Sequence, residues 1–231
     1  MIKHIRVILW KQIKDTLKNK TILIQFVMFP ILTLIMENAI EIEGMPEHYF
    51  ALLFGVMYVG MAPLVSMASI ISEEKGNNTL RVLLMSNVKP LEYLLGVGIY
   101  IWVICMIGAL VIGFAGKYSG TALAGFVLIL GIGILVSILV GAAIGTWSKN
   151  PMMATSISMP VMMIFSFLPM LSMFNETIGK FAKILYSQQI NLLLEQVEHI
   201  QLSWESVVVI GGNMVVASVL FVVAYRRSGL E

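Results

Sequence analysis

Residues 72–96 read SEEKGNNTLRVLLMSNVKPLEYLLG and separate two long apolar runs of the chain. Three early residues are of the types that cap helix N-termini, namely Asn77, Asn78 and Thr79. Apolar residues then recur at the spacing of one helical face, at Leu80, Leu83 and Leu84. Because Pro90 disfavours helical backbone at the residue before it, the pattern predicts a short amphipathic helix inside a loop over residues 72–90.

The charges of this loop allow two interpretations. Glu73 and Glu74 mark the end of the preceding apolar run, and the short helix after them would carry its apolar face outside the membrane. That face would suit the docking of a soluble partner protein. A helix that merely lies at the membrane interface would show the same pattern, so the residues alone leave both interpretations open.

The whole chain is too apolar for a soluble protein. Of its 231 residues, 58% are hydrophobic and 12% are charged, and the mean hydropathy is +0.91, whereas soluble domains carry about 25% charged residues. At about 20 residues per helical span, the apolar runs predict an all-α membrane protein with six transmembrane helices in one domain, residues 1–231. The predicted spans are 21–40, 50–71, 91–115, 121–146, 152–173 and 206–224.

Two other segments are amphipathic but do not have the length and apolarity of a span. Residues 2–20 place apolar side chains at helical spacing, with basic side chains mostly opposite. This pattern predicts a helix on the membrane surface rather than an ordinary basic flank of the first span. Residues 174–205 predict one or two short amphipathic helices that either lie at the outer surface or dip into the outer leaflet.

The basic residues predict the orientation of the chain. Twelve of its 15 lysines and arginines fall on the side that holds both termini and residues 72–90. Loops rich in lysine and arginine stay in the cytoplasm. We therefore expect a multi-pass protein of the plasma membrane with both termini and the 72–90 loop in the cytoplasm.

Motifs for catalysis and nucleotide binding are incomplete. Glu73 and Glu74 open the EExxxR signature of glutamate-dependent intramembrane proteases, but Asn78 stands in the place of its arginine. Gly116-Lys117 is followed by tyrosine, where a phosphate-binding loop needs serine or threonine. We assign no catalytic, cofactor-binding or metal-binding residue and expect no nucleic-acid partner. An intramembrane protease or a lipid-modifying enzyme is the alternative class.

The middles of the predicted spans carry no Asp, Glu, Lys, Arg or His. Such residues mark proton relays and ion-coupled transport sites when they occur. Energy for any transport is therefore expected to come from outside the membrane.

Two stripes of residues stand out inside the predicted spans. Small residues recur every four positions in the fourth span, at Gly133, Ser137, Gly141 and Gly145, and predict close packing against another helix of this chain or of a second copy. A methionine stripe with flanking serines runs along the fifth span, at Met152, Ser156, Met159, Met163, Ser166 and Met170. Because methionine adapts to varied apolar surfaces, this stripe is either one wall of a path for amphipathic cargo or ordinary packing.

The 72–96 stretch resembles the first cytoplasmic loop of ABC-2 type transporter permeases, which runs E-E-x-x-x-G-T-L-x-x-L-L and later E-x-L-x-G-K. The matching residues are Glu73, Glu74, Thr79, Leu80, Leu83, Leu84, Glu92, Leu94 and Gly96. Three positions depart from the pattern: Asn78 replaces the usual glycine, Asn87 a common proline and Val97 the basic residue. The surface helix, the six spans and the long segment before the last span fit the same family.

The resemblance implies that the chain is half of an exporter permease without enzymatic activity of its own. Two ATPase subunits holding ATP and Mg²⁺ would dock on a coupling helix in the loop, through Glu73, Glu74, Thr79, Leu80, Leu83 and Leu84. A second permease copy would complete the pore, and a homodimer is expected rather than a heterodimer. The expected cargo is an amphipathic peptide or a hydrophobic drug, with lipid or polysaccharide as the alternative.

Overall fold

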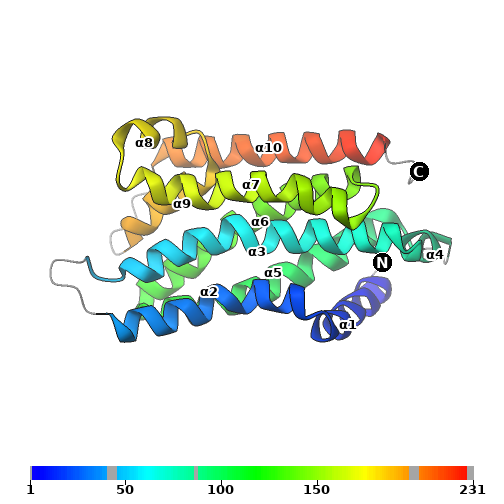
Figure 1. The fold of residues 1–231 in the computed structure, drawn as a ribbon, viewed down its shortest axis with the longest axis horizontal. Helices are drawn as coiled ribbons and strands as arrows, with labels where there is room; N and C mark the ends of the chain where they lie inside the picture. The colour runs from blue at the N-terminus through cyan, green and yellow to red at the C-terminus, as the bar shows by residue number, and fades with distance from the viewer. Residues whose placement is uncertain (1, 41–45, 86–87, 198–202, 228–231) are drawn as a thin grey trace.

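The computed structural model describes residues 2–40, 46–85, 88–197 and 203–227, and the regular structure within these ranges is helical (Figure 1). The helices are α1 (Ile2–Lys18), α2 (Lys20–Ala39), α3 (Tyr49–Gly76), α4 (Thr79–Met85), α5 (Pro90–Ala115), α6 (Gly120–Trp147), α7 (Pro151–Ser172), α8 (Glu176–Ala182), α9 (Tyr186–Glu195) and α10 (Trp204–Arg227). Six of them are long and apolar enough to cross a membrane: α2, α3, α5, α6, α7 and α10. The prediction of an all-α protein with six membrane spans is confirmed.

The boundaries of the spans agree with the predicted ones, with one exception. α3 continues to Gly76 instead of ending at residue 71, whereas the other ends differ from prediction by three residues or fewer. The extension contains Glu73, Glu74 and Lys75. Because glutamate and lysine are good helix formers, their charges end the apolar run without ending the helix.

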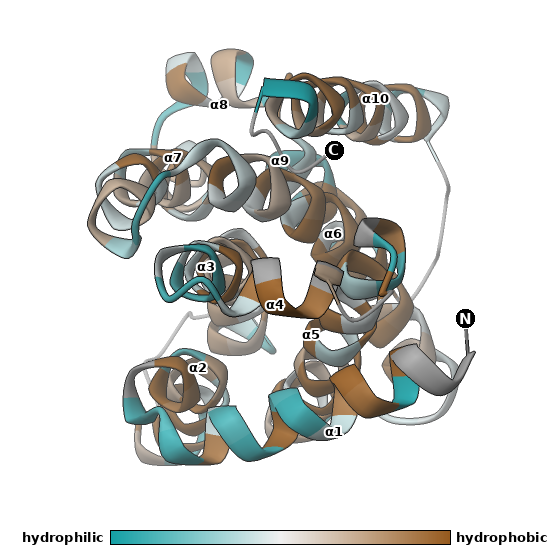
Figure 2. Cartoon of the chain, turned by 90° about the vertical axis from the view of Figure 1, so that its right-hand side faces the viewer, coloured by the Kyte–Doolittle hydropathy of each residue, from teal (hydrophilic) through white to brown (hydrophobic). Residues whose placement is uncertain are grey.

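α3 lies at the centre of the bundle. It contacts α2, α5, α6 and α7, and it is the most buried of the six spans. Figure 2 looks along the bundle from the α4 end and shows α2, α3 and α7 on one side, with α5 and α6 on the other. α7 and α10 are the most exposed spans, so much of their apolar surface is left for lipid or another protein.

Small residues let α6 approach α3 closely. A methyl group on Gly141 would overlap the backbone carbonyl oxygen of Leu64 on α3, and Ser137 donates a 2.6 Å hydrogen bond to the Val59 carbonyl oxygen. The partner of the predicted small-residue ridge is therefore a span of the same chain. The ridge residues that meet α3 are Gly133, Ser137, Gly141 and Gly145.

The segment between α7 and α10 contains one exposed helix and one buried helix. Phe181 on α8 is 73% exposed, whereas α9 contacts α3, α6, α7 and α10. The Tyr186 hydroxyl on α9 lies 2.7 Å from Ser137 Oγ, and the Ser206 hydroxyl on α10 donates a 2.8 Å hydrogen bond to Gln189 Oε1 on α9. α9 is thus buried within the protein, because its polar groups find partners there instead of in water.

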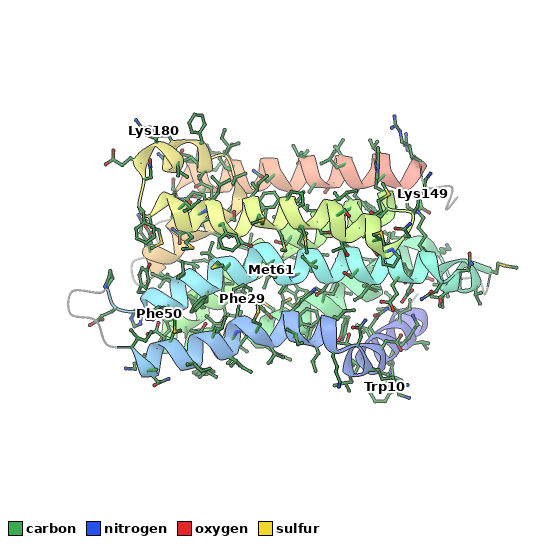
Figure 3. All side chains as sticks on the ribbon, viewed as in Figure 1. Trp10, Phe29, Phe50, Met61, Lys149 and Lys180 are labelled. Carbon is green, nitrogen blue, oxygen red and sulfur yellow. The ribbon has the colours of Figure 1, made fainter. Side chains whose placement is uncertain are left out.

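The two ends of the bundle carry different elements. α1, α4 and the Arg227 end of α10 lie at one end, and α8 lies at the other (Figure 1). Lys149 and Lys180 mark these opposite ends, and Trp10 points away from the bundle at the α1 end (Figure 3). The segments that the sequence analysis assigned to one side of the membrane therefore gather at one end of the molecule.

Candidate functional site

A tight turn joins the end of α3 to α4. Asn78 in this turn has a φ of 57°, which lies in the left-handed region. That region costs most residues about 1–2 kcal/mol, whereas glycine enters it freely and asparagine enters it more readily than others. This position is the glycine of the ABC-2 permease pattern, so the backbone explains why asparagine can replace it.

The Glu74 carboxylate ties the end of α3 to α1. Its Oε1 accepts a 2.7 Å hydrogen bond from Gln12 Nε2 and pairs with the Lys11 ammonium group. The Glu74 side chain is 9% exposed and that of Lys11 is 30% exposed, and the Tyr93 ring of α5 lies beside the carboxylate. Glu74 therefore holds parts of this chain together, while Glu73 is exposed.

α4 buries the leucines that were expected to face a partner. Leu80 is 3% exposed and belongs to the hydrophobic core, and Leu83 packs partly buried against that core. The exposed apolar side chains of α4 are Val82 at 64% and Met85 at 81%. The predicted outward direction of Leu80 and Leu83 is corrected here, because the nearest surface that removes these leucines from water belongs to their own chain.

Leu84 and Thr79 are the other two residues of α4 in the family pattern. The side chain of Leu84 lies outside the part of the chain that the structure describes. Thr79 is half-buried at the first position of α4. It also lines a polar cavity of about 690 Å³ between α1, the start of α2 and the end of α3, together with Lys11, Asp15 and Glu73.

The second half of the pattern shapes the start of α5. Glu92 accepts a 3.2 Å hydrogen bond from the Lys89 backbone N–H, as a glutamate in the first turn of a helix commonly does. A Cβ atom on Gly96 would lie 2.8 Å from Ile8 Cγ2. Glycine at this position therefore lets α1 pack directly on α5.

Lys11 and Gln12 belong to this site but were not predicted from the sequence. In the sequence, Lys11 is one of the basic residues opposite the apolar face of residues 2–20, and Gln12 has no evident role. Their partner Glu74 is more than 60 positions away in the sequence. Helical periodicity reports neighbours three or four positions apart, so it carries no signal for such a pair.

The methionine stripe of α7 is exposed over much of its length. Four of its residues form an outward surface, called the methionine face below: Met152, Ser156, Met159 and Met163. Met170 is half-buried. Ser166 is 1% exposed and donates a 3.2 Å hydrogen bond to the Met57 carbonyl oxygen on α3. Ser166 therefore lies on the buried side of α7, away from the predicted cargo wall.

These features define a multi-pass helical membrane protein with a short apolar helix exposed at one end of its bundle. Among the described residues, no three His, Cys, Asp or Glu side chains gather as ligands of a metal ion would. The chain belongs to the ABC-2 transporter family, because the family described as ABC-2 family transporter protein matches residues 8–226. It is therefore a membrane component of a transporter. A comparison with curated proteins found no similar protein.

Proposed function

We propose that this chain is half of the permease of an ATP-driven exporter, and that a separate ATPase subunit docks on α4. The observation that carries the proposal is the exposure of Val82 and Met85 on a helix that projects from the bundle (Figure 1). Buried apolar anchors supply much of the affinity of protein interfaces. The family supports the pairing, since ABC-2 permeases work with ABC ATPases.

Contacts with the rest of the chain hold α4 in place. Leu80 and Leu83 pack on the hydrophobic core, and Glu74 binds α1 through Lys11 and Gln12. Glu73 is exposed beside the turn and is free to meet a basic side chain of the ATPase. In this proposal, the buried leucines hold α4 against the core, and the exposed side chains contact the ATPase. The sequence had suggested that a single apolar face did both.

Two copies of the chain form the pore in this proposal, each bound to one ATPase that holds ATP and Mg²⁺. The exposed methionine face of α7 contributes one wall of the path. Flexible methionines accept apolar groups of varied shape, which fits an amphipathic peptide or a hydrophobic drug as cargo. The family resemblance supports export as the direction of transport. The excess of lysine and arginine at the α4 end supports a cytoplasmic position for that end and a location in the plasma membrane.

Purification of the complex tests the docking proposal. The permease is expressed together with its partner ATPase subunit, and the variant Val82→Asp/Met85→Asp is compared with the parent chain. Because each carboxylate would be desolvated in an apolar contact, the variant is expected to retain less than about one tenth of the ATPase, a loss of about 1.4 kcal/mol or more.

The matched control replaces two exposed apolar residues at the other end of the bundle. Phe181 and Ile184 are 73% and 71% exposed, and Phe181→Asp/Ile184→Asp is expected to retain the ATPase. Equal retention by both variants would show that α4 is not the docking element.

A further inference from the structure

An apolar groove lies on the side of the bundle formed by α5, α6 and α10. Its volume is about 450 Å³, and its lining includes Leu91, Gly98, Trp102, Leu135, Met214 and Phe221. α5 and α10 each pack on α6, and the groove occupies the space between them. The one polar atom of the Trp102 side chain is already used, because Nε1 donates a 3.2 Å hydrogen bond to the Gly131 carbonyl oxygen.

The groove has the length of one membrane leaflet. On α5 it runs from Leu91, at the first turn, to Trp102. Eleven steps at about 1.5 Å per residue span about 16 Å, and half of the hydrocarbon core of a bilayer is about 15 Å. On α10 it runs from Met214 toward Phe221, so it occupies the leaflet at the α4 end.

Basic residues follow or precede, in the chain, the helix turns that form the water-facing end of this groove. Lys89 precedes the first turn of α5 and is exposed. Arg226 and Arg227 end α10 shortly after Phe221, and the Arg227 guanidinium lies 5.6 Å from the centre of the Trp147 ring. A basic cluster where a membrane helix meets the headgroups attracts anionic lipids.

We propose that the groove binds one acyl chain of an anionic phospholipid, whose headgroup meets Lys89, Arg226 and Arg227. The solvent around this surface is lipid, and the lining offers only apolar contact. The site lies away from the methionine face, because α2, α3 and α7 occupy the other side of the bundle (Figure 2). The proposal rests on the membrane setting of the family and does not depend on ATPase docking or on the cargo.

Quenching of Trp102 fluorescence by brominated lipid tests the site. The full chain carries Trp10→Phe, Trp147→Phe and Trp204→Phe, so that Trp102 is the remaining tryptophan of four and a ring stays beneath Arg227. It is reconstituted into vesicles with either brominated phosphatidylglycerol or brominated phosphatidylcholine. Phosphatidylglycerol is expected to bind at least about fivefold more tightly, since even one of the three basic residues contributes about 1 kcal/mol near a membrane surface.

The headgroup contact is tested with charge variants in the same background. Lys89→Gln/Arg226→Gln/Arg227→Gln is expected to abolish the preference for phosphatidylglycerol. The control Lys117→Gln/Lys180→Gln/Lys183→Gln removes the same charge from the opposite side and is expected to keep the preference. Equal binding of the two lipids by the parent chain, or a preference that survives loss of the three rim charges, would overturn the proposal.

The acyl-chain contact is tested with leucine substitutions. A Cβ atom on Gly98 would lie 3.6 Å from Ile138 Cγ2, so Gly98→Leu is expected to fit and to fill the groove. Native mass spectrometry is expected to show a bound phospholipid on the parent chain and none on this variant. Gly211 faces open space, so Gly211→Leu is expected to keep the lipid, and loss of lipid from both variants would count against the groove.

These measurements use the purified permease without its ATPase. A failure of docking in Val82→Asp/Met85→Asp therefore leaves the lipid result unchanged, and the two proposals can fail independently.

Discussion

At the scale of a single residue, Glu74 connects the end of α3, next to the proposed docking helix α4, to the rest of the molecule. A buried carboxylate is costly unless it has charged and hydrogen-bonding partners, and Lys11 and Gln12 supply such partners to Glu74 Oε1. Glu73, its sequence neighbour, is exposed. The two adjacent glutamates of the family pattern thus differ in role, one holding α1 against α3 and the other left for a partner.

A double-mutant cycle measures the Lys11–Glu74 pair. Lys11→Met leaves the Glu74 carboxylate without its cation and is expected to lower the free energy of unfolding by roughly 1–3 kcal/mol. Lys11→Met/Glu74→Gln is expected to recover part of this loss, with a coupling energy of about 0.5–3 kcal/mol. Thermal unfolding in detergent provides the measurement, and Lys18→Met, on the exposed side of α1, is the control. Strictly additive costs would contradict a direct interaction.

At the scale of elements, α4 and α9 are two short helices whose stability and position depend on the helices packed around them. α4 has seven residues, too few to be stable alone, and it is held by the burial of Leu80 and Leu83. α9 looks amphipathic in sequence, yet Tyr186 and Ile190 are fully buried. Its polar side chains pair with other helices, as the hydrogen bond between Gln189 and Ser206 shows.

Cysteine labelling tests the insertion of α9. Ser187 on α9 is fully buried, so a thiol in Ser187→Cys is expected to react with a membrane-impermeant maleimide at least about tenfold more slowly than one in Phe181→Cys. This ratio corresponds to a local opening free energy of about 1.4 kcal/mol. The native Cys105 is buried and serves as an unreactive background. Equal rates at the two positions would place α9 at the surface.

Hydrophobic runs, helix formers and cap residues lie close together in the sequence, so they predicted the six spans and the short α4 helix. Whether a side chain faces the core or the surface of the bundle depends on contacts between segments that are distant in the sequence. Leu80 and Val82 are equally apolar in sequence, yet one faces the core and the other water. Lys11 and Glu74 meet in a fold in which α1 also packs on α5 at Gly96, and no local sequence pattern encodes these contacts.

The whole molecule has three surfaces with different expected neighbours. α4 presents two exposed apolar side chains, Val82 and Met85, to the proposed ATPase. The α2, α3 and α7 side (Figure 2) carries the methionine face, and the α5, α6 and α10 side carries the lipid groove. The proposed contacts with the ATPase, the cargo and the lipid therefore use separate surfaces of the molecule.

Polar substitutions distinguish the cargo wall from surface packing. Met159→Gln/Met163→Gln is expected to lower export by about tenfold while leaving the amount of assembled complex unchanged, because amides disfavour apolar cargo. Export of a fluorescent amphipathic peptide from vesicles provides the measurement. Val103→Gln/Ile107→Gln places the same groups at exposed positions of α5 and is expected to keep export. Similar losses of export and assembly in the methionine variant would assign the stripe to packing.

Site-specific cross-linking in the assembled transporter tests the central claim most directly. A photoreactive amino acid is placed at Met85, which is 81% exposed on α4, or at Phe181, which is 73% exposed on α8, and the products are identified by mass spectrometry. The account predicts a permease–ATPase product from position 85 and none from position 181. An ATPase product from position 181, or no ATPase product from position 85, would contradict docking at α4.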